Sequence, residues 1–186
     1  IELLSLSGKL GAQVRATVHS FGPLLLSKVL DLNETQTSVL SLVFKYCDDN
    51  QLPLLDLADL TTTLQYLGSD EAKASLAQYG GIAPATLGVI QRSIITLEQQ
   101  GAGLFFGEPE FDVRDLLGIN PDGTGRIHVL ELADVMDKPA LFSTFMLWLL
   151  AQLYATLPEV GDQPVPKLAF FFDEAHLLFD GPSASF

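Results

Sequence analysis

Hydrophobic residues recur at three- and four-residue intervals through much of the first hundred positions of the chain. In one such segment, leucines would share a single face of a helix, because residues at this spacing lie on the same side of helical turns. These leucines are Leu57, Leu60, Leu64 and Leu67. Asp56 can cap the start of this helix and Gly68 can end it. The same spacing predicts further helices over residues 22–32, 34–47, 69–79 and 87–100.

Shorter runs rich in apolar and β-branched residues predict strands. They cover residues 1–6, 14–21, 126–132 and 167–172. An uncharged run, residues 139–158, lies between the last two and approaches the length of a membrane span. Four polar side chains interrupt this run, and a strand-like segment follows it closely, so we predict a buried crossover helix. Strand, helix and strand then form a βαβ unit in a parallel sheet.

These elements predict an α/β fold in which a block of helices interrupts a core of strands. Residues 1–21 would supply edge strands of the core, and residues 22–103 would form the helical insertion. Residues 104–186 would return to the core as its βαβ part. The 186 residues and their 48% hydrophobic content are sufficient to bury a core of this kind.

The chain is strongly acidic, with 23 Asp and Glu against 10 Lys and Arg and a net charge of −13. This composition argues against a nucleic-acid clamp, which needs basic patches, and anionic membranes should repel it. The single cysteine, Cys47, excludes an internal disulfide and fits a helical core position. The sequence after Ile1 shows no secretory signal, so we expect a cytoplasmic protein of which this chain is an internal segment.

Two acids and a histidine follow the last predicted strand, in the sequence "KLAFFFDEAHLLFD" from Lys167 to Asp180. An apolar strand ending in Asp-Glu is the Walker B pattern of P-loop ATPases, although an ordinary strand can also end this way. Asp173 would hold Mg²⁺ beside the phosphates of ATP, and Glu174 would orient or deprotonate the attacking water. His176 could sense the γ-phosphate, couple to a neighbouring subunit, or only hydrogen-bond within its loop.

Such ATPases also need a phosphate loop of the form G-x-x-x-x-G-K-[ST]. The candidate here is "LLSLSGKL", in which Gly8 and Lys9 match the inner pair. Leu3 stands where the first glycine is needed, and Leu10 replaces the Ser or Thr that binds magnesium. We therefore predict that this chain has no phosphate loop and that the loop lies upstream in the parent protein.

Other stretches of the chain are long and unusual. They are "VRATVHSFGPLLLSKVLDLNETQ", "LLDLADL" and "GVIQRSIITLEQQGAGLFFGEPEFD", and with "KLAFFFDEAHLLF" they cover most of the chain from Val14 to Phe179. Together they resemble the bacterial HerA-like ATPase and helicase family. The resemblance implies a fragment of a RecA-like P-loop NTPase core, with a helical insertion between the phosphate-loop and Walker B strands and with ATP and Mg²⁺ as cofactors. The family's Walker B acids carry over to Asp173 and Glu174.

The same resemblance implies a homo-oligomer, because relatives of HerA form hexameric rings that move along DNA. The acidity of this segment gives no support to DNA binding by the segment itself. We expect part of the motor domain of an ATPase, which is inactive alone without its phosphate loop. The alternative function is an interaction or oligomerisation module formed by the helical block, in which the Asp-Glu pair is only structural.

Two other features allow competing interpretations. The segment "NPDGTGRIHVLE" spaces Asn120, Asp122, Thr124 and Glu131 like the ligands of a calcium loop, but a polar turn leading into a strand fits better. The arginines in "GVIQRS" and "DVRDLL" could contact a phosphate or a neighbouring subunit, although ordinary solvated or salt-bridged arginines are the simpler interpretation.

Overall fold

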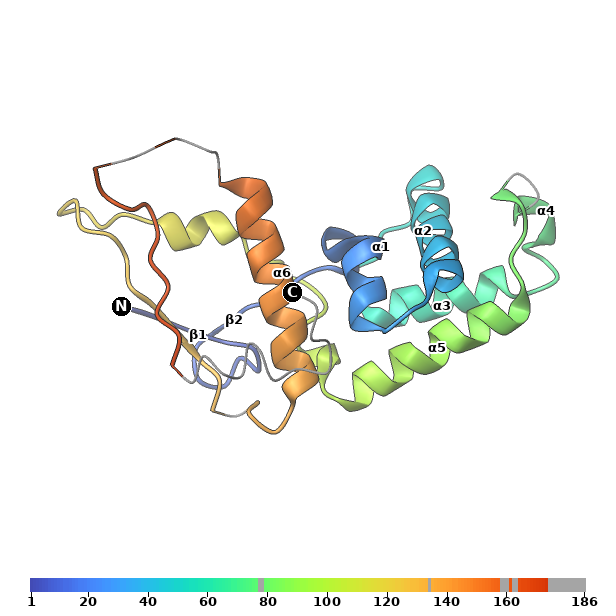
Figure 1. Cartoon of the computed structure of the whole chain (residues 1–186), viewed down its shortest axis with the longest axis horizontal. Helices are drawn as coiled ribbons and strands as arrows, with labels where there is room; N and C mark the ends of the chain where they lie inside the picture. The colour runs from blue at the N-terminus through green and yellow to red at the C-terminus, as the bar shows by residue number, and fades with distance from the viewer. Residues whose placement is uncertain (77–78, 134, 158–160, 162–163, 174–186) are drawn as a thin grey trace. The chain divides into compact units, whose positions relative to one another are not determined.

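A computed structural model describes residues 1–76, 79–133, 135–157, 161 and 164–173, and the chain forms two compact units (Figure 1). Residues 15–110 form the first, which we call the helical unit. Residues 1–14 combine with the chain from residue 111 onward to form the second, which we call the sheet unit. The chain enters the helical unit at residue 15 and leaves it at residue 110, and these two ends lie close to each other.

The helical unit is built from amphipathic helices joined by short connections. In its described residues these are α1 (Val18–Val29), α2 (Glu34–Asp49), α3 (Leu57–Leu67), α4 (Lys73–Leu76) and α5 (Pro84–Gln99), followed by the 3-10 turn η2 (Ala102–Leu104). Helix α5 packs against α2 and α3, and α1 packs against α2. The four leucines predicted to form the face of α3 are all buried, which confirms that helix and its orientation.

Side-chain caps fix where two of these helices begin. Asn33 accepts a hydrogen bond from the Gln36 N–H at 3.0 Å, and Gln36 Oε1 accepts one from the Asn33 N–H at 3.0 Å. Asp56 and Asp59 form the same reciprocal box at the start of α3. These boxes satisfy backbone donors that a helix leaves unpaired in its first turn. The predicted start of α2 is therefore confirmed at residue level.

The predicted strand over residues 14–21 is wrong for most of its length. Only Ala16 makes a strand-like bridge, and α1 begins at Val18. Thr17 explains the difference, because its Oγ1 accepts a hydrogen bond from the Ser20 N–H at 3.1 Å and caps the helix. Gly22, with φ of 77°, then kinks α1 before Pro23 starts its second part.

Backbone hydrogen bonds tie together the two ends of the helical unit. The Ala16 N–H donates to Phe105 O at 3.0 Å, and the Gly107 N–H donates to Ala16 O at 2.9 Å. The Arg15 guanidinium adds hydrogen bonds to Glu108 O at 2.6 Å and to Phe106 O at 3.3 Å. The helical unit is thus closed by a clamp consisting of residues 15–17 and 105–110.

The sheet unit contains three parallel strands in the order β2-β1-β3 among its described residues. They are β1 (Glu2–Ser5), β2 (Ala12–Gln13) and β3 (His128–Glu131). The unit also contains the 3-10 helix η3 (Val113–Leu117) and α6 (Pro139–Thr156), which contact one another. The strands predicted at residues 1–6 and 126–132 are confirmed, and the α/β class with them.

A six-residue connection links β1 and β2, although parallel strands normally need a crossover of a dozen residues or more. Gly11 makes this short path feasible. A Cβ atom at Gly11 would lie 2.4 Å from the backbone carbonyl of Leu3, so only a residue without a side chain fits against β1 there.

The long uncharged segment forms α6, as predicted. Leu141, Phe145 and Trp148 are buried, whereas Tyr154 is 88% exposed. By length and composition α6 is also apolar enough to cross a membrane. The face that carries Trp148 nevertheless packs inside the protein, as a core helix requires.

Replacing Arg15 with Met tests the clamp. We expect R15M to lower the free energy of unfolding of the helical unit by about 1–3 kcal/mol, because two carbonyl oxygens lose a charged donor. Urea unfolding would be followed by far-UV circular dichroism, with fluorescence of Trp148 reporting on the sheet unit. R114M, which removes a solvent-exposed arginine in the sheet unit, is the matched control and should cost less. Equal losses in both variants would contradict the clamp.

Candidate functional site

The predicted catalytic segment is described only as far as Asp173, an exposed residue in a turn. Glu174 and His176 lie outside the described residues. Residues 164–172, which lead to Asp173, have no regular secondary structure. The strand predicted at residues 167–172 is therefore not formed with any described partner, and a RecA-like core stays a prediction.

The exposure of the three phenylalanines before Asp173 shows that this segment is not a buried strand. Phe170, Phe171 and Phe172 are 42%, 95% and 43% exposed. A parallel strand in the middle of a sheet needs neighbours on both edges and cover on both faces. The rings of Phe170 and Phe172 nevertheless stack with centroids 5.8 Å apart, as side chains two positions apart do on an extended backbone. The segment thus has the side-chain alternation of a strand, but no hydrogen-bonded neighbouring strand among the described residues.

The carboxyl ends of the described strands meet at one edge of the sheet, where open α/β sheets bind ligands. Ser5 pairs in register with Gln13 of β2 and with Glu131 of β3, so these three residues mark that edge. Ser5 is fully buried and Glu131 half-buried. The sequence analysis did not single out Ser5 or Gln13 and did not join them to Glu131. The available signal was that each of these strands ends in a polar residue.

In the loop after β1, two backbone N–H groups of "LLSLSGKL" are hydrogen-bonded within the loop itself. The Gly8 N–H donates to Ser5 Oγ at 2.8 Å, and the Lys9 N–H donates to Ser7 Oγ at 3.1 Å. In a phosphate loop such N–H groups point at the phosphates instead. Here the loop's own serines already occupy them.

At the opposite edge of the sheet, the side chains of Arg126 and His128 approach the carboxylate of Glu2. Arg126 Nη1 lies 3.0 Å from Glu2 Oε1, and His128 Nδ1 lies 3.2 Å from Glu2 Oε2. This edge carries the amino ends of β1 and β3, away from the side where ligands usually bind. The Arg126–Glu2 ion pair joins the start of β1 to the chain just before β3, and the imidazole of His128 lies against the same carboxylate.

The calcium-like segment folds as a turn followed by a strand, as predicted. Asp122 accepts hydrogen bonds from the Thr124 hydroxyl at 2.6 Å and from its N–H at 3.0 Å, and Asn120 donates to the same hydroxyl at 3.1 Å. The hydroxyl and then the N–H hold the pKa of Asp122 below its ordinary value. The segment leads into β3, where an EF-hand needs a helix. No cluster of three metal-ligating side chains occurs in the described part of the chain.

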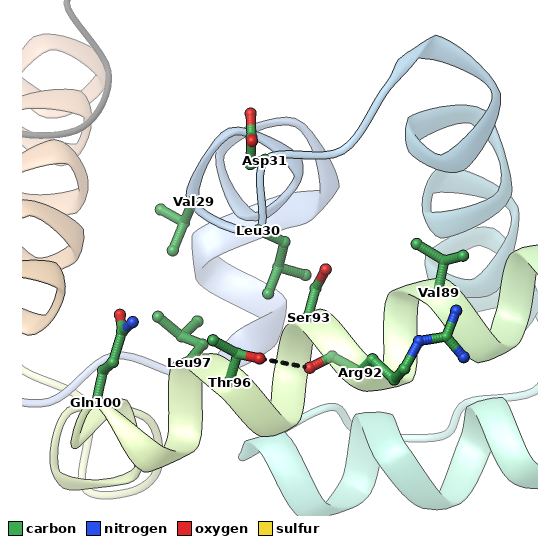
Figure 2. A pocket seen from close by; sticks show the side chains of 9 residues that line it. All are labelled: Val29, Leu30, Asp31, Val89, Arg92, Ser93, Thr96, Leu97 and Gln100. Atoms are coloured by element: carbon green, nitrogen blue, oxygen red, sulfur yellow. Dashed lines mark hydrogen bonds between the residues drawn. The ribbon is translucent and has the colours of Figure 1, made fainter.

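The two arginines singled out in the sequence differ in their surroundings. Arg114 donates through Nε and Nη2 to the carboxylate of Asp112. The guanidinium hydrogen bonds hold the pKa of Asp112 below its ordinary value, so the salt-bridge interpretation is confirmed for Arg114. Arg92 forms no ion pair with any described residue and is exposed, as expected for a solvated arginine, beside an open depression between α1 and α5 (Figure 2).

Comparison with known proteins gives one finding. The family model of the helicase HerA-like C-terminal domain matches the chain over residues 1–186. No curated protein and no solved structure matched it.

The exposure of Phe171 yields a direct test of the segment that leads to Asp173. We expect Phe171→Ser to change the free energy of unfolding by less than about 0.5 kcal/mol, as for exposed side chains generally. The matched substitution Phe145→Ser, at a buried position of α6, should cost several kcal/mol. Denaturant unfolding of both variants checks this. A large loss from Phe171→Ser would mean that the segment is buried as a strand in solution.

Proposed function

The chain belongs to the helicase HerA-like C-terminal family, and from this we propose that it is part of the motor of an ATP-hydrolysing enzyme. The observation that carries the proposal is the match over residues 1–186. It is supported by the position of Asp173 and Glu174 directly after an apolar, strand-like segment. The parent protein would be an ATPase that acts as a helicase or translocase.

In this proposal the two acids have different tasks. Asp173 holds Mg²⁺, which neutralises charge on the β- and γ-phosphates of ATP. Glu174 accepts a proton from the attacking water or orients it. His176 sits two residues further along the chain, where it could respond to the γ-phosphate. The phosphate loop comes from sequence outside this chain, since the loop of Gly8 and Lys9 is closed on its own serines.

We further propose that residues 168–172 pair as a parallel strand when the motor is complete. Their side chains already alternate, and the carboxyl edge marked by Ser5 and Glu131 is the edge to which Asp173 would then be delivered. Catalysis needs these acids fixed and shielded from water. In the described structure the segment is exposed, so the isolated chain would not hydrolyse ATP.

By family resemblance the parent forms a ring of identical subunits. A net charge of −13 gives no support to DNA contact through this chain. DNA, if bound, would therefore be held by other parts of the ring.

A second function is favoured by the closure of the helical unit. The clamp formed by residues 15–17 and 105–110 lets residues 15–110 fold as a unit with its own core. Such a unit could serve as a module for protein interaction or oligomerisation. Light scattering of the 186-residue chain without nucleotide tests this alternative, because self-assembly would favour it and a monomer would count against it.

Substitution of Glu174 tests the catalytic proposal in the full-length protein. We expect Glu174→Gln to reduce ATP turnover about 10²–10⁴-fold while ATP still binds, because the amide cannot accept the proton. Asp180→Asn, which removes an acid six positions along the same segment, is the control and should keep most activity. Turnover close to wild type in Glu174→Gln would refute the proposed role.

Thermal unfolding of the 186-residue chain with Mg·ATP tests whether the phosphate loop is missing from it. We expect no shift in Tm, because the residues that would hold the phosphates lie elsewhere. A ligand present at 100 times its Kd would add about 2.7 kcal/mol of stability, which would be easy to detect. A clear shift would contradict this account of the site.

A further inference from the structure

One face of the parallel sheet carries aliphatic side chains that the described part of the chain leaves exposed. Leu3 of β1 and Val129 of β3 pair in register and therefore point to the same face. Ile127, two positions before Val129, shares that face by the alternation of an extended chain. Leu3 is 49% exposed, Val129 37% and Ile127 59%. We call these three residues the open patch.

The opposite face of the same strands is covered. Leu4, the next residue of β1, is only 8% exposed, and the side chain of His128 in β3 is 9% exposed. The ion pair between Arg126 and Glu2 also belongs to this face, as the alternation requires. In the described structure the sheet is thus packed on one side and open on the other.

A parallel sheet with one open face is unusual, because the helices that connect parallel strands cover both faces. The carboxyl end of the open face already has a cover. There Ser5 is fully buried, and its Oγ accepts a hydrogen bond from the Gly8 N–H at 2.8 Å. The exposed part is therefore the amino half of the strands, where the open patch lies. Covering it would remove three aliphatic side chains from water.

The small size of the open patch limits what can cover it. A stable complex between free proteins uses roughly 20–30 residues on each side, far more than this patch supplies. A second copy of the chain would also bring a second net charge of −13, and the two copies would repel each other. A helix of the same polypeptide needs less contact, because it does not lose the translational freedom of a separate molecule. Its apolar stripe alone would fill the patch.

A phosphate loop joins a strand to a helix, and such helices pack on a face of the sheet. The face that carries Leu4 and His128 is already filled. We propose that the open patch is the docking surface for the helix that follows the phosphate loop in the parent protein. That helix would start at the carboxyl edge marked by Ser5 and Glu131 and lay its apolar stripe along the open patch. This inference rests on the proposed function, which requires such a loop.

Cysteine labelling tests whether the open patch is covered in the full-length protein, after its native cysteines have been replaced. We expect Leu3→Cys and Val129→Cys to react with a maleimide at least about tenfold more slowly there than in the 186-residue chain, because a covered thiol reacts only when the structure opens locally. Leu24→Cys, at an exposed leucine of the helical unit, is the matched control and should react equally fast in both proteins. Equal rates in both proteins at positions 3 and 129 would overturn the proposal.

Photo-crosslinking identifies what covers the patch. With benzoylphenylalanine in place of Leu3, irradiation of the full-length protein should link position 3 to the helix that follows the G-x-x-x-x-G-K-[ST] sequence, as read by mass spectrometry of the joined peptides. A link to a second copy, or to another segment, would overturn the proposal. Turnover of Glu174→Gln separates the two proposals. Fast labelling of Leu3→Cys with turnover lost in Glu174→Gln would reject only the docking surface, whereas slow labelling with turnover retained would reject only the catalytic role.

Discussion

The helical unit depends on one long-range closure. Arg15 and Glu108 are 93 positions apart in the sequence, and the hydrogen bonds around them join the two ends of residues 15–110. Bringing such distant points together is entropically unfavourable and needs compensation from contacts that persist. The buried rings of Phe21, Phe105 and Phe106 pack edge-on and tilted at this closure and supply such contacts. The helices between these ends can then form one core.

Local signals predicted the helices well. Asn33 and Gln36 predicted the start of α2, and the leucines of α3 predicted its buried face. A capping box and a helical face each depend only on residues a few positions apart. Thr17 carried a similar signal that the β-branched sequence around it obscured, so residues 18–21 at the start of α1 were predicted as strand, whereas the rest of α1 was predicted as helix. Burial also raises the pKa of the Cys47 thiol, in agreement with the core position predicted from its spacing.

Features that depend on distant partners were harder to predict. The sequence suggested that residues 167–172 are a strand, but it does not say which strand they pair with, and the described structure leaves Phe171 exposed. Ser5 and Glu131 pair in the sheet although the whole helical unit separates them in the sequence, and no local pattern reveals such a pairing. The open depression beside Arg92 could not be predicted for the same reason, since α1 and α5 line it together. Asp173 was predicted from a motif, and motifs are local.

The exposed phenylalanines before Asp173 also affect how the isolated chain behaves at high concentration. The sequence "LAFFF" is uncharged, free of Pro and Gly, and already extended. Such segments pair readily with identical segments on other molecules, edge to edge. The chain's net charge of −13 keeps molecules apart at low ionic strength, but salt screens this repulsion over about 10 Å at 0.1 M. Solubility of the isolated chain should therefore fall as salt is added.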